Sequence, residues 1–179
     1  MSTNTASLQR ATIAAEPDIG AMTDREFMFR AFKESQAAVD YVLMMARVAD
    51  VWDNLIDKDA PVSDKDINEA FCLLAVEMPK NAFYRVHMDE LLPVMETGIL
   101  NWMTANILER ENTEGRAIEI SHVIRYSIAD VAMLTAALCG GREWVEQVGP
   151  ELRMRSQRSD LKEYINSLQV KREVNHAAQ

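Results

Sequence analysis

The chain has 179 residues, of which 48% are hydrophobic and 26% charged, and its formal net charge is −9. That length and balance suit one globular domain with its own core. The negative charge argues against direct nucleic-acid binding and against an anionic membrane surface as partner, because both depend on an excess of lysine and arginine.

The pattern of the chain predicts an all-α fold. The 6 glycines and 5 prolines are few for an all-β protein, which needs many turns. We expect a single-domain helical bundle of about five to seven helices. The expected organisation is a flexible N-terminal arm over residues 1–22, a helical domain over 23–173 and a tail over 174–179.

The first helix has a clear start. Thr23 followed by Glu26 forms a capping box, in which each side chain bonds to the backbone of the other residue. The helical period then continues to about Asp57, with a kink expected near Ser35.

The second helix is predicted to begin at Ser63 and to end near Glu77, because Pro79 lacks the N–H that the next turn needs. Asn81 is expected to cap a short helical piece over 83–88, and a longer helix follows over 90–109.

The second half of the chain should contain one central helix over 116–138. It is the most apolar segment, and Gly140 and Gly141 supply its stop. A short helix over 142–148 should end at Gly149-Pro150, and Ser159 should cap a last helix over 160–173.

Three aspartates form the most suggestive cluster. Asp50, Asp53 and Asp57 follow one another at steps of three and four, which places them on one helical face. Three carboxylates on one face repel unless a cation compensates them. A solvated acidic edge, a pairing with lysine or arginine, or a Mg²⁺ site would each fit the pattern.

Other polar residues could complete a site. His122, Asp130 and Glu109 are the candidate catalytic groups. Asp130 stands in an apolar run, where an unpaired carboxylate is costly, so we expect it to pair with Arg47 or Arg125 or to bind a metal. The alternative interpretation of His122 is a structural one, a hydrogen-bonded histidine within or at the edge of the core.

Trp52, Trp102 and Trp144 are candidate interface residues. A tryptophan is more often a core or boundary residue, but an exposed one anchors protein contacts well. Cys72 and Cys139 are expected to be free thiols, since both lie in apolar helical stretches.

No signal peptide opens the chain, and the longest apolar run, 131–139, is far shorter than the ~20 residues that cross a bilayer. We therefore expect neither secretion by a signal peptide nor a membrane span.

Three stretches carry a resemblance to a group of proteins. They are 51–59 (VWDNLIDKD), 98–106 (GILNWMTAN) and 140–153 (GGREWVEQVGPELR). In order and spacing they resemble small uncharacterised α-helical proteins encoded by tailed bacteriophages. The resemblance implies a viral protein located in the bacterial host cytoplasm or in the virion, and it carries over no catalytic residue.

Three functions remain open from the sequence. The first is a non-enzymatic structural or interaction protein, a phage particle component or assembly factor, with a protein partner or a homo-oligomer and no cofactor. The second is a Mg²⁺-dependent enzyme acting on a phosphate or diphosphate through Asp50, Asp53 and Asp57. The third is an acidic inhibitor of a host nucleic-acid enzyme.

Overall fold

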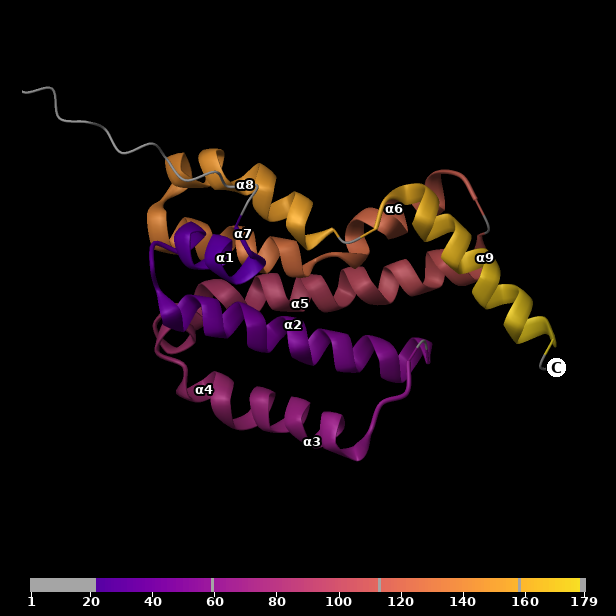
Figure 1. The fold of residues 1–179 in the computed structure, drawn as a ribbon, viewed down its shortest axis with the longest axis horizontal. Coiled ribbons are helices and arrows are strands. Elements are labelled where there is room, and N and C mark those ends of the chain that lie inside the picture. Colours follow the sequence, from indigo (N-terminus) through magenta and orange to yellow (C-terminus); the bar gives the residue numbers. More distant parts are fainter. Residues whose placement is uncertain (1–21, 59, 113, 158, 178–179) are drawn as a thin grey trace, which may run out of the picture.

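The computed structural model describes residues 22–58, 60–112, 114–157 and 159–177. In these residues the chain is all-α, which confirms the predicted bundle (Figure 1). The helices are α1 (Asp24–Ala31), α2 (Gln36–Asp57), α3 (Asp64–Cys72), the π-helical turn η2 (Leu73–Glu77), α4 (Met78–Lys80), α5 (Ala82–Glu111), α6 (Arg116–Arg125), α7 (Ile128–Gly140), α8 (Arg142–Ser156) and α9 (Leu161–Ala177). The predicted N-terminal arm lies outside the described residues, except for Met22.

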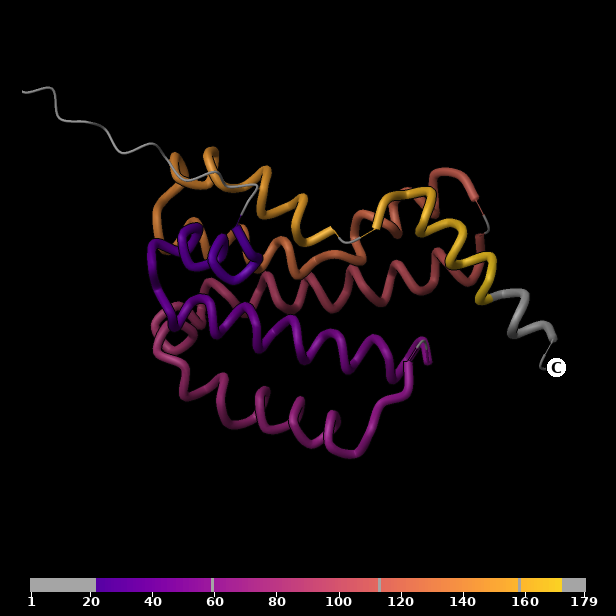
Figure 2. The backbone as a smooth tube through the Cα atoms, in the orientation of Figure 1, coloured from indigo at the N-terminus to yellow at the C-terminus, as the bar shows by residue number. Residues whose placement is uncertain are grey.

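The first predicted helix is two helices. The capping box of Thr23 and Glu26 is present at the start of α1. Lys33 and Glu34 then adopt left-handed backbone conformations with φ of 52° and 61°, and Ser35 caps α2. The expected kink near Ser35 is therefore a complete break. The chain reverses its direction there, between α1 and α2 (Figure 2).

Pro79 does not end the second helix as the sequence predicts. Before the proline, the backbone hydrogen bonds change from the α-helical to the π-helical pattern. The N–H of Met78 bonds to the carbonyl of Leu73, five residues back. The helical path then continues through Pro79 to Lys80. A π-helical turn widens the helix by one residue and accommodates proline, which has no backbone N–H to donate.

The long helix α5 joins the two pieces that the sequence separates. Asn81 caps it, with its Oδ1 accepting from the N–H of Tyr84 at 2.9 Å. The predicted boundary between the pieces survives as a kink at His87, whose φ and ψ are −113° and 19°. Pro93 lies inside the helix, within the first turns after that kink.

The predicted central helix over 116–138 is broken into α6 and α7, which meet at 45°. The break falls at Tyr126 and Ser127, whose hydroxyl groups find tertiary partners. Tyr126 bonds to Ser159 at 2.8 Å, and Ser127 donates to the carbonyl of Gly98 at 3.1 Å. Among the described residues, no single helix has the length and apolar character to cross a membrane, although the bent pair α6 and α7 passes that test jointly.

Gly149-Pro150 also fails to end a helix, since α8 continues to Ser156. Gly149 is buried, and its Cα side faces Met133 of α7 so closely that an added Cβ would lie 2.8 Å from the methionine methyl carbon. The glycine therefore serves helix packing. The last helix, α9, is capped by Asp160 and not by Ser159, because the N–H of Glu163 donates to Asp160 at 2.8 Å.

The main core lies where α1, α2, α5, α7 and α8 meet. Phe27, Phe32, Tyr41 and Leu91 are almost fully buried in it. The central role expected for residues near 130 holds for α7, which buries Ala129, Val131, Ala132, Thr135 and Ala136. A smaller core joins α6 to α9 through Ile118, Tyr164 and Leu168.

Candidate functional site

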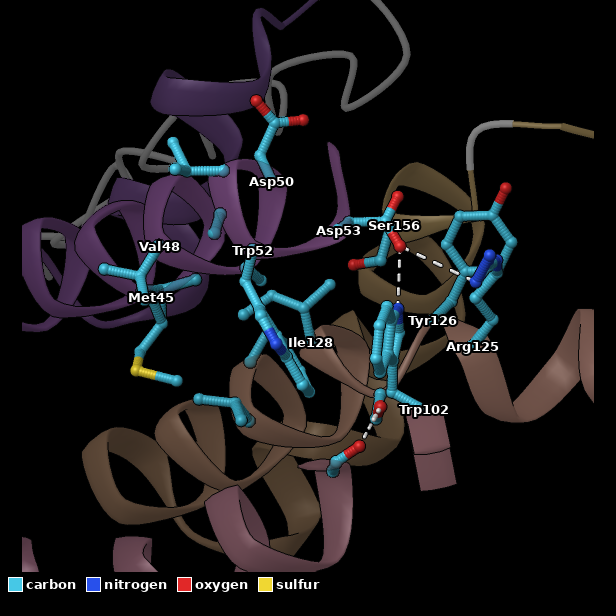
Figure 3. Close-up of a pocket in the computed structure, with 18 of the residues that line it drawn as sticks. Met45, Val48, Asp50, Trp52, Asp53, Trp102, Arg125, Tyr126, Ile128 and Ser156 are labelled. Atoms are coloured by element: carbon cyan, nitrogen blue, oxygen red, sulfur yellow. Dashed lines mark hydrogen bonds and ion pairs between the residues drawn. The ribbon is translucent and has the colours of Figure 1, made fainter. Parts of the chain in front are cut away.

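The three aspartates of α2 do not converge. Asp50 is exposed and lies 3.5 Å from Arg47, one turn back on the same helix. Asp53 accepts a hydrogen bond from the indole nitrogen of Trp102 at 2.7 Å. Figure 3 shows Asp50 pointing away from Asp53. Asp50 therefore pairs within α2, whereas Asp53 and Asp57 contact residues of neighbouring helices.

Arg125 at the end of α6 compensates the remaining charge. Its guanidinium pairs with Asp57, lies 3.6 Å from Asp53, and lies 3.4 Å from Glu109 of α5. Lys171 of α9 is 3.9 Å from Asp57. Three acids thus surround two cations, and this balance leaves no excess positive charge to attract a phosphate group.

Glu109 is buried within this cluster. The hydroxyl of Tyr164 donates to it, and the same hydroxyl lies 3.1 Å from Ser121 of α6. Burial raises the pKa of Glu109 above its ordinary value, although the neighbouring Arg125 acts in the opposite direction. Burial also raises the pKa of Tyr164. The network joins α2, α5, α6 and α9 at one end of the bundle.

His122 is buried beside this network. One ring nitrogen lies 3.0 Å from the backbone carbonyl of Ser159, and the ring contacts Tyr126 and Tyr164. The amide of Gln157 lies 3.2 Å from the other nitrogen. His122 and Glu109 therefore come near one another through Tyr164, with the histidine held by the loop between α8 and α9.

Asp130 lies apart from Glu109 and His122. It pairs with Arg153 of α8 and is about half exposed. The prediction that Asp130 pairs with Arg47 or Arg125 is wrong, because each of these arginines pairs with other acidic residues. In the part of the chain that the structure describes, no three His, Cys, Asp or Glu side chains are placed to hold a metal ion together.

The three tryptophans pack within the molecule. Trp52 and Trp102 pack against one another with ring centroids 4.0 Å apart and ring planes tilted by 37°. Trp144 donates its indole N–H to the carbonyl of Ala31 at 2.7 Å, and the amine of Lys33 lies 3.3 Å from its ring centroid. Trp144 therefore fixes the end of α1 against α8.

An apolar groove of about 860 Å³ runs along α2. Its floor contains Val48, Trp52 and Leu55. Two of its walls come from α3 with η2 and from α5, and residues of α1, α7 and α8 line much of the remainder. At one end the hollow reaches Arg125 and Tyr126, so a polar end meets an apolar body (Figure 3). The wall residues are Ile67, Ala70, Phe71 and Leu74 on one side, and Met95, Gly98, Ile99 and Trp102 on the other.

The α3–η2 wall is unusual because none of its residues is fully buried, although Ile67 and Leu74 are partly covered. All residues of α3 and η2 are described, and none of them is buried. Phe71 is 71% exposed although it faces the groove. Isolated helices of this length are marginal in water, and an amphipathic helix normally gains its stability by burying its apolar face.

The α5 wall continues as an open apolar stripe, defined by Leu92, Ile99, Met103 and Ile107. These residues follow one another at steps of seven, four and four, so they share one helical face. Each is between 44% and 51% exposed. Such a contiguous apolar face marks a contact surface far better than scattered exposed side chains do.

Of the wall residues, only Trp102 is among the predicted site residues. The signal in the sequence is that α3 and α5 are amphipathic, but a sequence does not show which apolar faces find a neighbour within the fold. The helical period of Ile67, Phe71 and Leu74 would have identified the face without its exposure.

Comparisons with family models, curated proteins and solved structures find no match for this chain. The fold and its groove therefore define only a class: an all-α single chain with an open apolar groove next to a charge-balanced polar cluster.

Proposed function

We propose that this chain is a non-enzymatic interaction protein that binds a helical protein segment in the groove between α3–η2 and α5. The observation that carries the proposal is the α3–η2 wall, whose apolar face is only partly covered in the described chain, with Phe71 71% exposed. A helix laid between the two walls would give α3–η2 the buried face that it lacks.

The setting that we propose is the particle of a tailed bacteriophage, or its assembly. The support is the resemblance carried by the stretches 51–59, 98–106 and 140–153. The first two supply Trp52 and Trp102, whose rings contact one another at the groove. An assembly protein works through such contacts and needs no catalytic group.

Capture from infected cells tests the proposal. The tagged chain is expressed in a bacterium infected by a phage that encodes it, and its bound proteins are quantified beside Phe71→Glu and Met154→Glu. Phe71 and Met154 are equally exposed, at 71% and 72%, but only Phe71 lines the groove.

The expected result is a stoichiometric partner, which includes a differently tagged copy of the chain, bound by wild type and by Met154→Glu and lost in Phe71→Glu. Equal binding by all three proteins would show that contacts form elsewhere, and an absence of any partner would refute an interaction role.

A further inference from the structure

We infer that the occupant of the groove is a second copy of this chain, with α3–η2 of each copy lying against the apolar stripe of the other's α5. This inference rests on the proposed function and adds the identity of the partner. Each copy displays both an amphipathic helix without a fully buried residue and an α5 stripe whose side chains are about half exposed. A two-fold symmetric contact needs such self-complementary surfaces, since each copy must offer what the other lacks.

The walls cannot close on one another within one chain without breaking ion pairs. Arg47 of α2 holds α3 through Asp66 and through Glu69, which it contacts at 3.0 Å. Asp66 is fixed further by Ser63 in the capping box that begins α3. Together these contacts and the hydrogen bonds of Ser63 lower the pKa of Asp66 to about 2, so the carboxylate stays charged at neutral pH. The α3–η2 wall is therefore held beside α2, away from α5.

The apolar area is sufficient for a stable dimer. The exposed parts of the groove and stripe side chains amount to roughly 800 Å² per copy, which is about the area that each partner contributes to a standard protein interface. The side chains counted are Leu55, Ile67, Phe71, Leu74, Leu92, Ile99, Met103 and Ile107.

Charge at the groove ends favours one orientation. Within the chain, α3 runs antiparallel to α2, and α5 runs parallel to α2, because Asn81 reaches Ala37 while Trp102 reaches Asp53. If α3 of one copy lies antiparallel to α5 of the other, Asp64 comes closest to the end of the stripe where Arg110 lies. Both are exposed charges of opposite sign, so the antiparallel contact is complementary at this end of its rim.

Cysteine cross-linking identifies the occupant. In a Cys72→Ser, Cys139→Ser background, Ala70→Cys places a thiol on the α3 wall and Ile99→Cys one on the α5 wall of the same groove. Mild oxidation by copper phenanthroline should give a covalent dimer that needs both cysteines. Ala70→Cys combined with Met154→Cys, which is exposed on α8 and does not line the groove, is the matched control and should remain uncoupled.

Light scattering on the unmodified chain gives the second readout. The expected molar mass at micromolar concentration is twice 20.3 kDa. Phe71→Glu should return it to 20.3 kDa, while Met154→Glu should not. An intrachain disulfide, or no link at all, would overturn the inference.

The failure of this inference is distinct from the failure of the proposed function. A chain that stays at 20.3 kDa and still captures a different protein in a Phe71-dependent way overturns the second copy and leaves the groove as a binding site. A chain that shows neither self-association nor groove-dependent capture overturns both.

Discussion

At the scale of single residues, polar groups in the interior are arranged in pairs and networks that stabilise helix contacts. Glu109, Tyr164 and Arg125 are buried together, and each satisfies another's hydrogen-bonding capacity. A buried polar group is tolerated when it is paired and costs free energy when it is not. Tyr164, whose hydroxyl is paired, and Tyr41, whose hydroxyl has no partner among the described residues, illustrate the two cases.

Removing the hydroxyl of Tyr41 should stabilise the protein. Its side chain is fully buried, and the hydroxyl has no hydrogen-bond partner among the described residues. We expect Tyr41→Phe to raise the free energy of unfolding by about 1 kcal/mol, because an unsatisfied group is lost. Chemical denaturation measures it. Tyr164→Phe is the control and should lower stability by about 2 kcal/mol, since that hydroxyl donates to a carboxylate. Equal losses in both variants would contradict the account.

The raised pKa of Glu109 predicts a pH effect. Because burial raises this pKa above 4.5, the folded state holds the proton more tightly than the unfolded state does. The stability that this group contributes is therefore fully present below pH 4.5 and is lost as the pH rises through the folded pKa. The free energy of unfolding of wild type minus that of Glu109→Gln should fall between pH 4 and pH 7. A difference that rises with pH would mean that Arg125 outweighs burial.

At the scale of helices, side-chain caps decide where segments begin. Asn81 has two functions, because its oxygen caps α5 while its amide nitrogen donates to the carbonyl of Ala37 in α2 at 2.8 Å. It therefore links the start of one long helix to the start of the other.

Substitutions at Asn81 should separate these two functions. Asn81→Ser keeps a capping oxygen but cannot reach Ala37, so we expect a loss of about 1 kcal/mol. Asn81→Ala removes both interactions and should cost about 2 kcal/mol. Thermal or urea unfolding of the two variants beside wild type gives the ranking, and an equal cost for both would show that only one interaction matters.

Local signals in the sequence predict most helix starts and the break near Ser35, but not the break between α6 and α7. Thr23 with Glu26, Ser63 and Asn81 act within four residues, so their caps are readable from the sequence. The break at Tyr126 contains neither glycine nor proline and depends on a hydroxyl contact with a residue 33 positions away. The sequence predicts a helix end at Gly149, but this glycine lies within α8 and lets α7 approach α8.

The candidate site was only partly predictable for the same reason. The spacing of the aspartates on α2 was readable, but their partners come from distant helices. Arg125 meets Asp57 across 68 residues. Asp130 finds Arg153 on the next helix, although the sequence offered Arg47 and Arg125 as equal candidates. Which apolar faces stay uncovered depends on the complete packing of the bundle.

At the scale of the whole molecule, the chain consists of a well-packed body and one wall that is held only from one side. The body is centred on α2, α5 and α7, while α3–η2 lies along α2 without burying a residue (Figure 1). The central claim is that α3–η2 gains its buried face only by association across the groove. Its stability should therefore depend on protein concentration.

Hydrogen exchange of the backbone amides of residues 67–77 tests this claim most directly. In dilute protein these amides should exchange at least about tenfold faster than at high concentration, because local opening is suppressed when the groove is filled. The amides of α7 should change little, and Phe71→Glu should abolish the concentration dependence. Protection of residues 67–77 that equals that of α7 at every concentration, in wild type and in Phe71→Glu alike, would contradict the account.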